Sequence, residues 1–171
     1  MKAPNSKPII LAAPIILAAI VGWLPITVCA EEGDPSTVTT PDFGDFSSST
    51  LTAKAWGGLI SKDQKAAQLF ANKCIETYRT QALEMQKSLK EPTTTKEETE
   101  KLWALNDVGT CYFILGQSLE AEGKTKEAVA AYNFLTENLA FAQCWDEKGW
   151  YWKPADAARE KAKALAFDAL E

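Results

Sequence analysis

Apolar residues recur at intervals of three and four from Leu51 onward, a spacing that is typical of amphipathic helices. The segment 63–89 carries the longest such stripe, made of Ala67, Leu69, Phe70, Cys74, Ile75, Tyr78, Ala82, Met85 and Leu89. The sequence has no run of alternating β-branched residues and no Asn-Gly hairpin signal. We therefore predict an all-α domain over residues 51–171, with helices over about 51–60, 63–89, 96–121 and 125–141 and a last helix that begins at Pro154.

Polar residues and helix breakers mark the boundaries between these helices. Ser61 or Asp63 can cap the helix 63–89, and Pro92 prevents its continuation. Thr95 and Glu98 have the spacing of a capping box at the start of the next helix. The boundaries therefore rest on start and stop signals as well as on periodicity.

The segment "YFILGQSLEAEGKTKEAVAAYNFL" contains more than helical periodicity. A Leu-Gly pair is followed by a large apolar residue, a turn glycine, and an alanine four positions before an aromatic residue: Leu115, Gly116, Leu119, Gly123, Ala128 and Tyr132. Gly116 and Ala128 are small where two helices would cross closely, and Tyr132 would fill the groove to an adjacent repeat. This pattern resembles the tetratricopeptide repeat (TPR) family.

A weaker copy of the pattern precedes it, with Ala67, Phe70 and Cys74 at its packing positions. The copy departs from the family because Ala55 stands where a glycine is expected and no proline closes either repeat. Ala67 and Ala128 are 61 residues apart, whereas a regular array repeats about every 34 residues. The resemblance implies a short, divergent TPR-like solenoid of about five helices, with two repeats and a C-terminal capping helix. Because proteins of this family commonly bind other proteins, the resemblance also implies protein–protein binding.

The first 30 residues have the features of an export signal. Lys2 and Lys7 precede an uncharged stretch over residues 9–30, which ends in Val28-Cys29-Ala30. We predict cleavage after Ala30; a retained membrane anchor is the alternative, and lipidation of Cys29 is a third possibility. In all three cases residues 31–171 are exported, and we expect them in the bacterial periplasm or cell envelope.

Residues 31–50, "EEGDPSTVTTPDFGDFSSST", are rich in Ser, Thr, Asp, Gly and Pro and lack hydrophobic periodicity. Such a composition is typical of a disordered linker. The predicted organisation is therefore a signal peptide or membrane anchor over residues 1–30, a linker over 31–50 and the helical domain over 51–171.

The chain contains no histidine, which excludes histidine-based catalysis and histidine metal sites. Without residues 1–30, which hold two of the 18 basic residues and none of the 23 acidic ones, the net charge is −7. An acidic domain repels phosphate groups, so nucleic acid and anionic membrane surfaces are not expected partners. Cys74, Cys111 and Cys144 match no metal-binding spacing, and the sequence leaves a disulfide between two of them open.

The residues that could carry chemistry favour a binding function over catalysis. No phosphate-binding glycine loop, nucleophile motif or paired catalytic carboxylates stand out, so we predict a protein without enzymatic activity or cofactor. By the TPR resemblance, a protein or peptide partner would bind a groove lined by Lys54, Trp56, Asn106, Thr110 and Gln117. A structural subunit of a larger envelope assembly is a variant of this function that the sequence leaves open.

The segment "CWDEKGWYWKPAD" concentrates aromatic residues ahead of the last predicted helix: Trp145, Trp150, Tyr151 and Trp152. These residues either pack against the neighbouring helices or form a platform for an envelope glycan. Packing is favoured because the ends of a short repeat array need to be capped. Glycan binding is kept as the alternative function.

Overall fold

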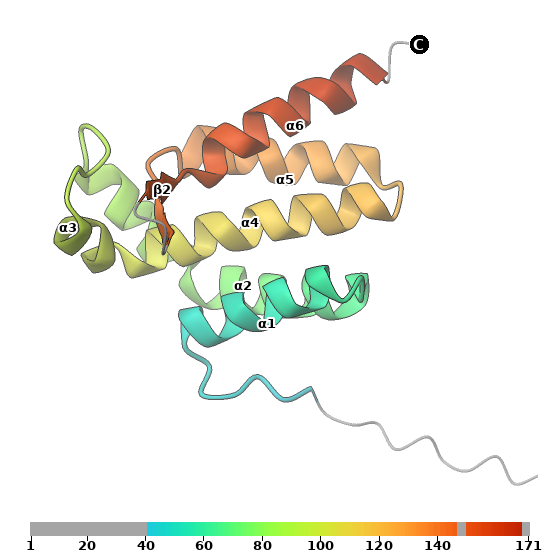
Figure 1. Cartoon of the computed structure of the whole chain (residues 1–171), viewed down its shortest axis with the longest axis horizontal. Helices are drawn as coiled ribbons and strands as arrows, with labels where there is room; N and C mark the ends of the chain where they lie inside the picture. The colour runs from blue at the N-terminus through green and yellow to red at the C-terminus, as the bar shows by residue number, and fades with distance from the viewer. Residues whose placement is uncertain (1–40, 147–149, 169–171) are drawn as a thin grey trace, which may run out of the picture. The chain divides into compact units, whose positions relative to one another are not determined.

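The computed structural model describes residues 41–146 and 150–168, apart from the side chains of residues 145, 146, 150 and 168. The described part is mainly helical (Figure 1), which confirms the predicted all-α class. Its helices are α1 (Ser48–Ile60), α2 (Gln64–Ser88), α3 (Lys96–Lys101), α4 (Trp103–Ala121), α5 (Thr125–Asn138) and α6 (Pro154–Asp168). Two short strands, β1 (Cys144–Asp146) and β2 (Trp150–Trp152), pair antiparallel ahead of α6.

Helix α4 lies between two pairs of helices (Figure 1). The hairpin of α1 and α2 packs on one side of it, and α5 and α6 pack on the other. The apolar stripes face inward, and the largest fully buried apolar side chains are Tyr132, Leu51, Leu105, Ile114, Leu135, Leu139 and Val108. A single core therefore runs through both helical hairpins, as the periodicity predicts.

The helix caps agree with the sequence at two starts and extend the domain at a third. Asp63 accepts a hydrogen bond from the Ala66 amide at 3.0 Å, and Thr95 accepts one from the Glu98 amide at 3.3 Å. Helix α1 begins three residues earlier than predicted, because Ser47 caps it through the Thr50 amide. These side-chain oxygens satisfy amides that have no partner inside the helix.

The predicted disordered linker over 31–50 is too long at its C-terminal end. The ring of Phe43 meets Phe70 edge-on at 5.9 Å, and the Tyr78 hydroxyl donates to the Phe46 carbonyl at 2.8 Å. These contacts attach the segment before α1 to α2. Residues 41–50 therefore belong to the folded domain, whereas residues 1–40, with the predicted signal or anchor and the rest of the linker, lie outside the described residues.

The predicted single helix 96–121 is wrong, since it is two helices that meet at Leu102. The backbone of Leu102 has φ −92° and ψ 33°. In a continuous helix the Thr99 carbonyl would accept from the amide of residue 103. Here it accepts from the Leu102 amide at 3.0 Å and from the Asn106 side-chain amide at 2.7 Å. The Asn106 side chain thus fixes the break.

The segment after α5 also differs from the predicted helix and loop. Helix α5 ends at Asn138, and residues 144–146 pair with 150–152 where the sequence predicts no strand. Gln143 anchors this hairpin: its amide donates to the Asn106 side chain and its Nε2 donates to the Thr93 carbonyl, each at 2.9 Å. Long-range hydrogen bonds therefore hold in place a ribbon that is too short to be stable alone.

Candidate functional site

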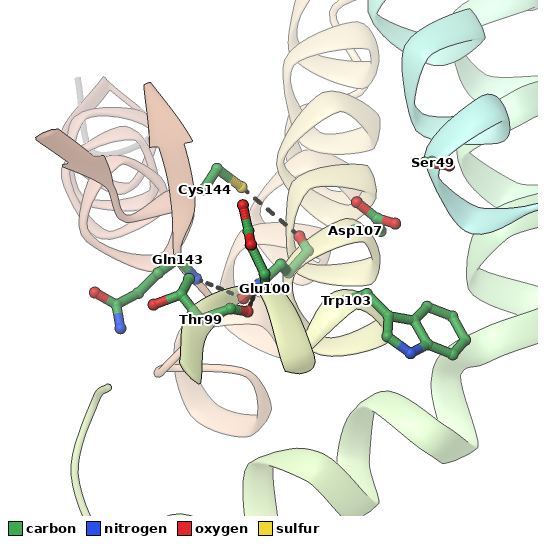
Figure 2. A pocket seen from close by; sticks show the side chains of 8 residues that line it. Ser49, Thr99, Glu100, Trp103, Asp107, Gln143 and Cys144 are labelled. Atoms are coloured by element: carbon green, nitrogen blue, oxygen red, sulfur yellow. Dashed lines mark hydrogen bonds between the residues drawn. The ribbon is translucent and has the colours of Figure 1, made fainter. Parts of the chain in front are cut away.

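A hollow of about 300 Å³ opens where α1, α3, α4 and the β-hairpin meet (Figure 2). We call it the hairpin pocket. It is lined by Ser49 from α1, Thr99 and Glu100 from α3, Trp103, Asn106 and Asp107 from α4, and Gln143 and Cys144 at the start of the hairpin. Because the lining comes from separate elements, the pocket depends on the folded arrangement and not on one sequence motif.

Asp107 places a largely buried carboxyl group in this pocket. Its partner is the hydroxyl of Ser48, which donates to the Asp107 carboxylate. Burial raises the pKa of Asp107 above its usual value, and the Ser48 hydrogen bond offsets only part of this shift. No Lys or Arg of the described residues forms an ion pair with it. The carboxylate is thus held partly out of water without a compensating cation.

Trp103 stands one helical turn before Asp107 on the same face of α4. Its side chain is 40% exposed, although a residue of this size is highly buried on average. The ring of Tyr78 contacts the indole edge-on, with 5.5 Å between the ring centres. One part of the indole is therefore fixed by packing against α2, and the other part is open to solvent at the pocket.

Amide hydrogen bonds from α4 hold the two other walls of the pocket, α3 and the start of the β-hairpin. Asn106 bonds to the Thr99 carbonyl through its nitrogen and to the Gln143 amide through its oxygen, at 2.7 and 2.9 Å. The Gln143 side chain continues to the carbonyl and hydroxyl of Thr93. These hydrogen bonds tie α3, α4 and the start of the β-hairpin to one another, so the pocket is formed before any ligand is present.

Cys144 contributes a thiol that is not suited to nucleophilic chemistry. Its Sγ lies 3.0 Å from the Thr110 hydroxyl, and burial raises the pKa of Cys144 to about 11. A thiol with this pKa is protonated at neutral pH, and the thiolate is the nucleophilic form. Among the described residues, no group of three or more Cys, Asp or Glu side chains could hold a metal ion. Cys144 is therefore a neutral, hydrogen-bonded thiol in the pocket lining near neutral pH.

The predicted partner groove does not form as expected. Asn106 and Thr110 are only 8% and 3% exposed, and both use their side chains in hydrogen bonds inside the fold. Trp56 packs on Phe113, with 6.5 Å between the ring centres. Lys54 and Gln117 are half-buried, and Lys54 pairs with Asp42 at 3.0 Å. Of the five predicted groove residues, only Asn106 lines the hairpin pocket.

The aromatic segment contributes packing through Trp152. Its ring meets Phe113 of α4 edge-on at 5.1 Å and lies 6.1 Å from Trp56 of α1. Tyr151 is half-buried, and the side chains of residues 145 and 150 lie outside the described ones. The predicted packing role thus holds for Trp152, while the predicted platform at Trp145 and Trp150 has no described side chain to support it.

The residues of the repeat pattern lie in the helix interfaces. Ala67, Cys74, Ala128 and Tyr132 are fully buried, and Gly123 has the positive φ of 73° that suits a turn glycine. The same core partly buries Phe70, Leu115 and Leu119, and Gly116 lies against the Tyr132 ring. In the first hairpin the close approach occurs at Gly58 against the backbone of Ala67, and Ala55 is buried nearby in the core.

Trp103, Asp107 and Gln143 are site residues that the sequence reasoning missed. On the predicted helix 96–121, Trp103 and Asp107 fall beside the apolar stripe and would be expected in solvent. The one signal available was an aromatic residue and an acidic residue one helical turn apart. That signal is weak, because such pairs are common on exposed helix faces.

No protein-family model, curated protein or solved structure matches this chain. Within the described residues, no helix is both long enough and apolar enough to cross a membrane.

Proposed function

We propose that this chain is an exported, TPR-like protein–protein interaction module or scaffold of the cell envelope, without catalytic activity. The observation that carries the proposal is the hairpin pocket, where an exposed indole and a half-buried carboxylate lie on a helical frame. Aromatic anchors in preformed hollows are typical centres of protein interfaces. Such a site needs no moving part and no cofactor to bind a side chain.

The helical arrangement supports the TPR-like part of the proposal. Two hairpins, α1–α2 and α4–α5, stack through α2 and α4, and α6 covers α5 as a capping helix would. Glycines stand at the close approaches, Gly58 against Ala67 in the first hairpin and Gly116 against Tyr132 in the second. This is the order of small and aromatic residues that leads us to propose two divergent repeats.

The proposed location depends on residues 1–30. An uncharged apolar stretch after two lysines supports export, and a membrane would be contacted only through this segment if it is retained. The acidic charge of the rest of the chain argues against nucleic acid as a partner. We therefore place the interaction in the periplasm or on the outer side of the cell envelope.

Site-specific photocrosslinking of the full chain in its native cells tests this function. A photoreactive residue at position 103 should capture one defined protein, because position 103 faces the open pocket. The matched control is position 126, since Lys126 is exposed on α5 outside that pocket. Capture of the same proteins from both positions, or of none from position 103, would contradict the proposal.

Glycan binding remains the second candidate because aromatic faces with polar edges suit sugar rings. Trp103 has this character, since its indole is 40% exposed and the carboxylate of Glu100 lines the same pocket. Retention of the full chain on insoluble envelope glycan, lost with Trp103→Ala while helicity is kept, would favour this candidate. Failure to be retained would remove it.

A further inference from the structure

We infer that the hairpin pocket receives the cationic end of a lysine or arginine side chain, with Asp107 as its counter-charge and Trp103 as its aromatic wall. The inference rests on the proposed function, because it names the chemistry of the partner residue that a protein-binding pocket would select. Its basis is the combination of charge, aromatic surface and volume in one hollow.

The charges of the pocket favour a cation. Among the described residues, its lining includes two carboxylates, Asp107 and Glu100, and no basic side chain. Glu100 has a partner, since Lys96 lies 3.6 Å from it on α3. Asp107 has the Ser48 hydroxyl, and burial raises its pKa. A partly buried carboxylate is stabilised when a cation approaches it, because desolvation has already weakened its interaction with water.

Glu120 is another partly buried acid of this domain, and its partners can be compared with those of Asp107. The Tyr132 hydroxyl donates to Glu120 at 2.9 Å, and Lys161 pairs with it at 3.0 Å. Glu120 is thus satisfied by a hydroxyl and by a cation that a neighbouring helix supplies. Asp107 has the hydroxyl but no cation from the described residues. The position of the missing cation is the pocket itself, which is open to a side chain from another molecule.

Trp103 supplies the second part of the recognition. The face of an indole attracts ammonium and guanidinium groups within about 6 Å of the ring centre, more strongly than the other aromatic rings do. Residues four apart on a helix have their Cβ atoms about 5–6 Å apart. Figure 2 shows both side chains on the α4 flank of the pocket, so a side chain that reaches Asp107 passes close to Trp103.

The size of the pocket fits one side chain. Its volume of about 300 Å³ is at the lower end of the range for small-molecule sites, about 300–1,000 Å³. An extended lysine or arginine side chain could place its apolar stem along the pocket and its charged end at Asp107. An acidic side chain would meet both carboxylates, and a neutral one would leave Asp107 without a counter-charge.

Titration of the purified, ¹⁵N-labelled full chain with small cations tests the inference. The probes are N-acetyl-arginine amide and N-acetyl-lysine amide, and N-acetyl-citrulline amide serves as the neutral analogue of similar shape. We expect the two cationic probes to shift the Trp103 indole N–H resonance in a saturable way, while the citrulline compound leaves it unchanged. Equal shifts with the arginine and citrulline compounds would overturn the inference, as would no shift with any probe.

Variants with matched controls assign the effect to the pocket. Asp107→Asn keeps the shape of the side chain and its ability to accept from Ser48, and it should weaken binding about 10- to 100-fold, as for loss of a charged hydrogen bond. Glu127→Gln removes an exposed acid near the start of α5, by the opposite end of α4, and should not change binding. If both variants bind equally well, Asp107 is not the counter-charge. Trp103→Leu keeps an apolar side chain without the indole face and should also weaken binding.

The pH dependence gives an independent check. Binding should weaken on acidification as Asp107 takes up a proton, and this should begin above the usual range for aspartate because burial raises its pKa. The other ionisable groups in the lining are Glu100 from α3 and Cys144, whose pKa of about 11 keeps it neutral throughout. Binding that is constant between about pH 7 and pH 4 would contradict the role of Asp107.

The two proposals can fail separately. If position 103 crosslinks to a protein while cationic and neutral probes bind alike, the interaction function stands and the basic-residue inference is wrong. If the cationic probes bind through Asp107 while no protein is captured, the chemistry of the pocket stands and the protein-binding function is wrong.

Discussion

The neighbouring glycines Gly57 and Gly58 of α1 provide a sharp test of how closely α1 and α2 approach. A Cβ atom at Gly58 would lie 2.5 Å from the backbone nitrogen of Ala67 and 2.9 Å from its Cα atom. A Cβ atom at Gly57 would meet nothing within 4 Å. The two positions share a helix and differ in their surroundings, so Gly57→Ala is a matched control for Gly58→Ala.

The expected magnitudes follow from two opposing effects. Alanine is more favourable than glycine inside a helix by about 0.8–1.0 kcal/mol, so Gly57→Ala should stabilise the domain by roughly that amount. Gly58→Ala has the same advantage, but its methyl group would push against the backbone of α2, and overpacking costs about 1–3 kcal/mol or more. We expect Gly58→Ala to be less stable than Gly57→Ala by about 1–3 kcal/mol, because the helix advantage is common to both variants.

The assay is urea unfolding of both variants and the wild type, followed by circular dichroism at the helical band. The slope of the transition should be unchanged, so that a shift in midpoint reports stability. Thermal unfolding should show the same order, with several degrees between the two variants. A Gly58→Ala variant that is as stable as Gly57→Ala, or more stable, would contradict this prediction, because α1 and α2 would then not be in backbone contact.

Three further predictions concern the second hairpin, the pocket acid and the thiols. Gly116→Ala should lower the free energy of unfolding by about 1–3 kcal/mol, since its Cβ would lie 2.3 Å from the Tyr132 ring; unchanged stability in urea would mean that the ring can move aside. Asp107→Asn should be more stable than the wild type near pH 7 and equal to it below about pH 4, as measured by urea unfolding. Because the pKa of Asp107 is raised in the folded state, the free energy of unfolding of the wild type falls as the pH rises through that folded-state pKa. An Asp107→Asn variant that is less stable than the wild type near pH 7 would contradict this prediction. Cys111 and Cys144 should react with Ellman's reagent near pH 8 only after denaturation, because burial raises both pKa values, and fast reaction of the native chain would contradict this.

Local signals made most helices of this fold predictable. Asp63 and Thr95 cap the helices that the sequence assigns to them, because a side chain that accepts from an amide three residues later acts within one turn. Most of the stripe from Ala67 to Ala82 is buried or half-buried, because periodicity reports which face of a helix meets the core, and Leu69 at its edge is 39% exposed. Predictions of this kind need no knowledge of distant contacts.

The features that the sequence did not predict depend on side-chain contacts that hydrophobic periodicity does not report. The break at Leu102 requires the Asn106 side chain to take the Thr99 carbonyl, and periodicity does not distinguish that from an uninterrupted helix. The β-hairpin after α5 requires Gln143 to reach Thr93, which is 50 residues away. Neither contact leaves a pattern in the local sequence, so periodicity predicts a regular helix at the first place and a loop at the second.

The predicted groove failed for a related reason. The TPR resemblance assigns each residue a face from its distance to the signature positions, and it assumes regular repeats. Helix α4, which the resemblance would make the first helix of a second repeat, begins only after the break at Leu102, and the β-hairpin covers its first turns. Asn106 and Thr110, expected to face a partner, are therefore turned toward the hairpin and buried.

Asn106 connects the fold to the proposed site. Its two side-chain atoms bond to Thr99 on one wall and Gln143 on the other, so the interaction that breaks the helix also sets the width of the pocket. A pocket held in this way has little conformational freedom left to lose when a side chain enters it. Preorganisation of this kind increases affinity, because association then costs less ordering entropy. A single buried amide can thus explain why a surface as small as the hairpin pocket would suffice to recognise one residue of a partner.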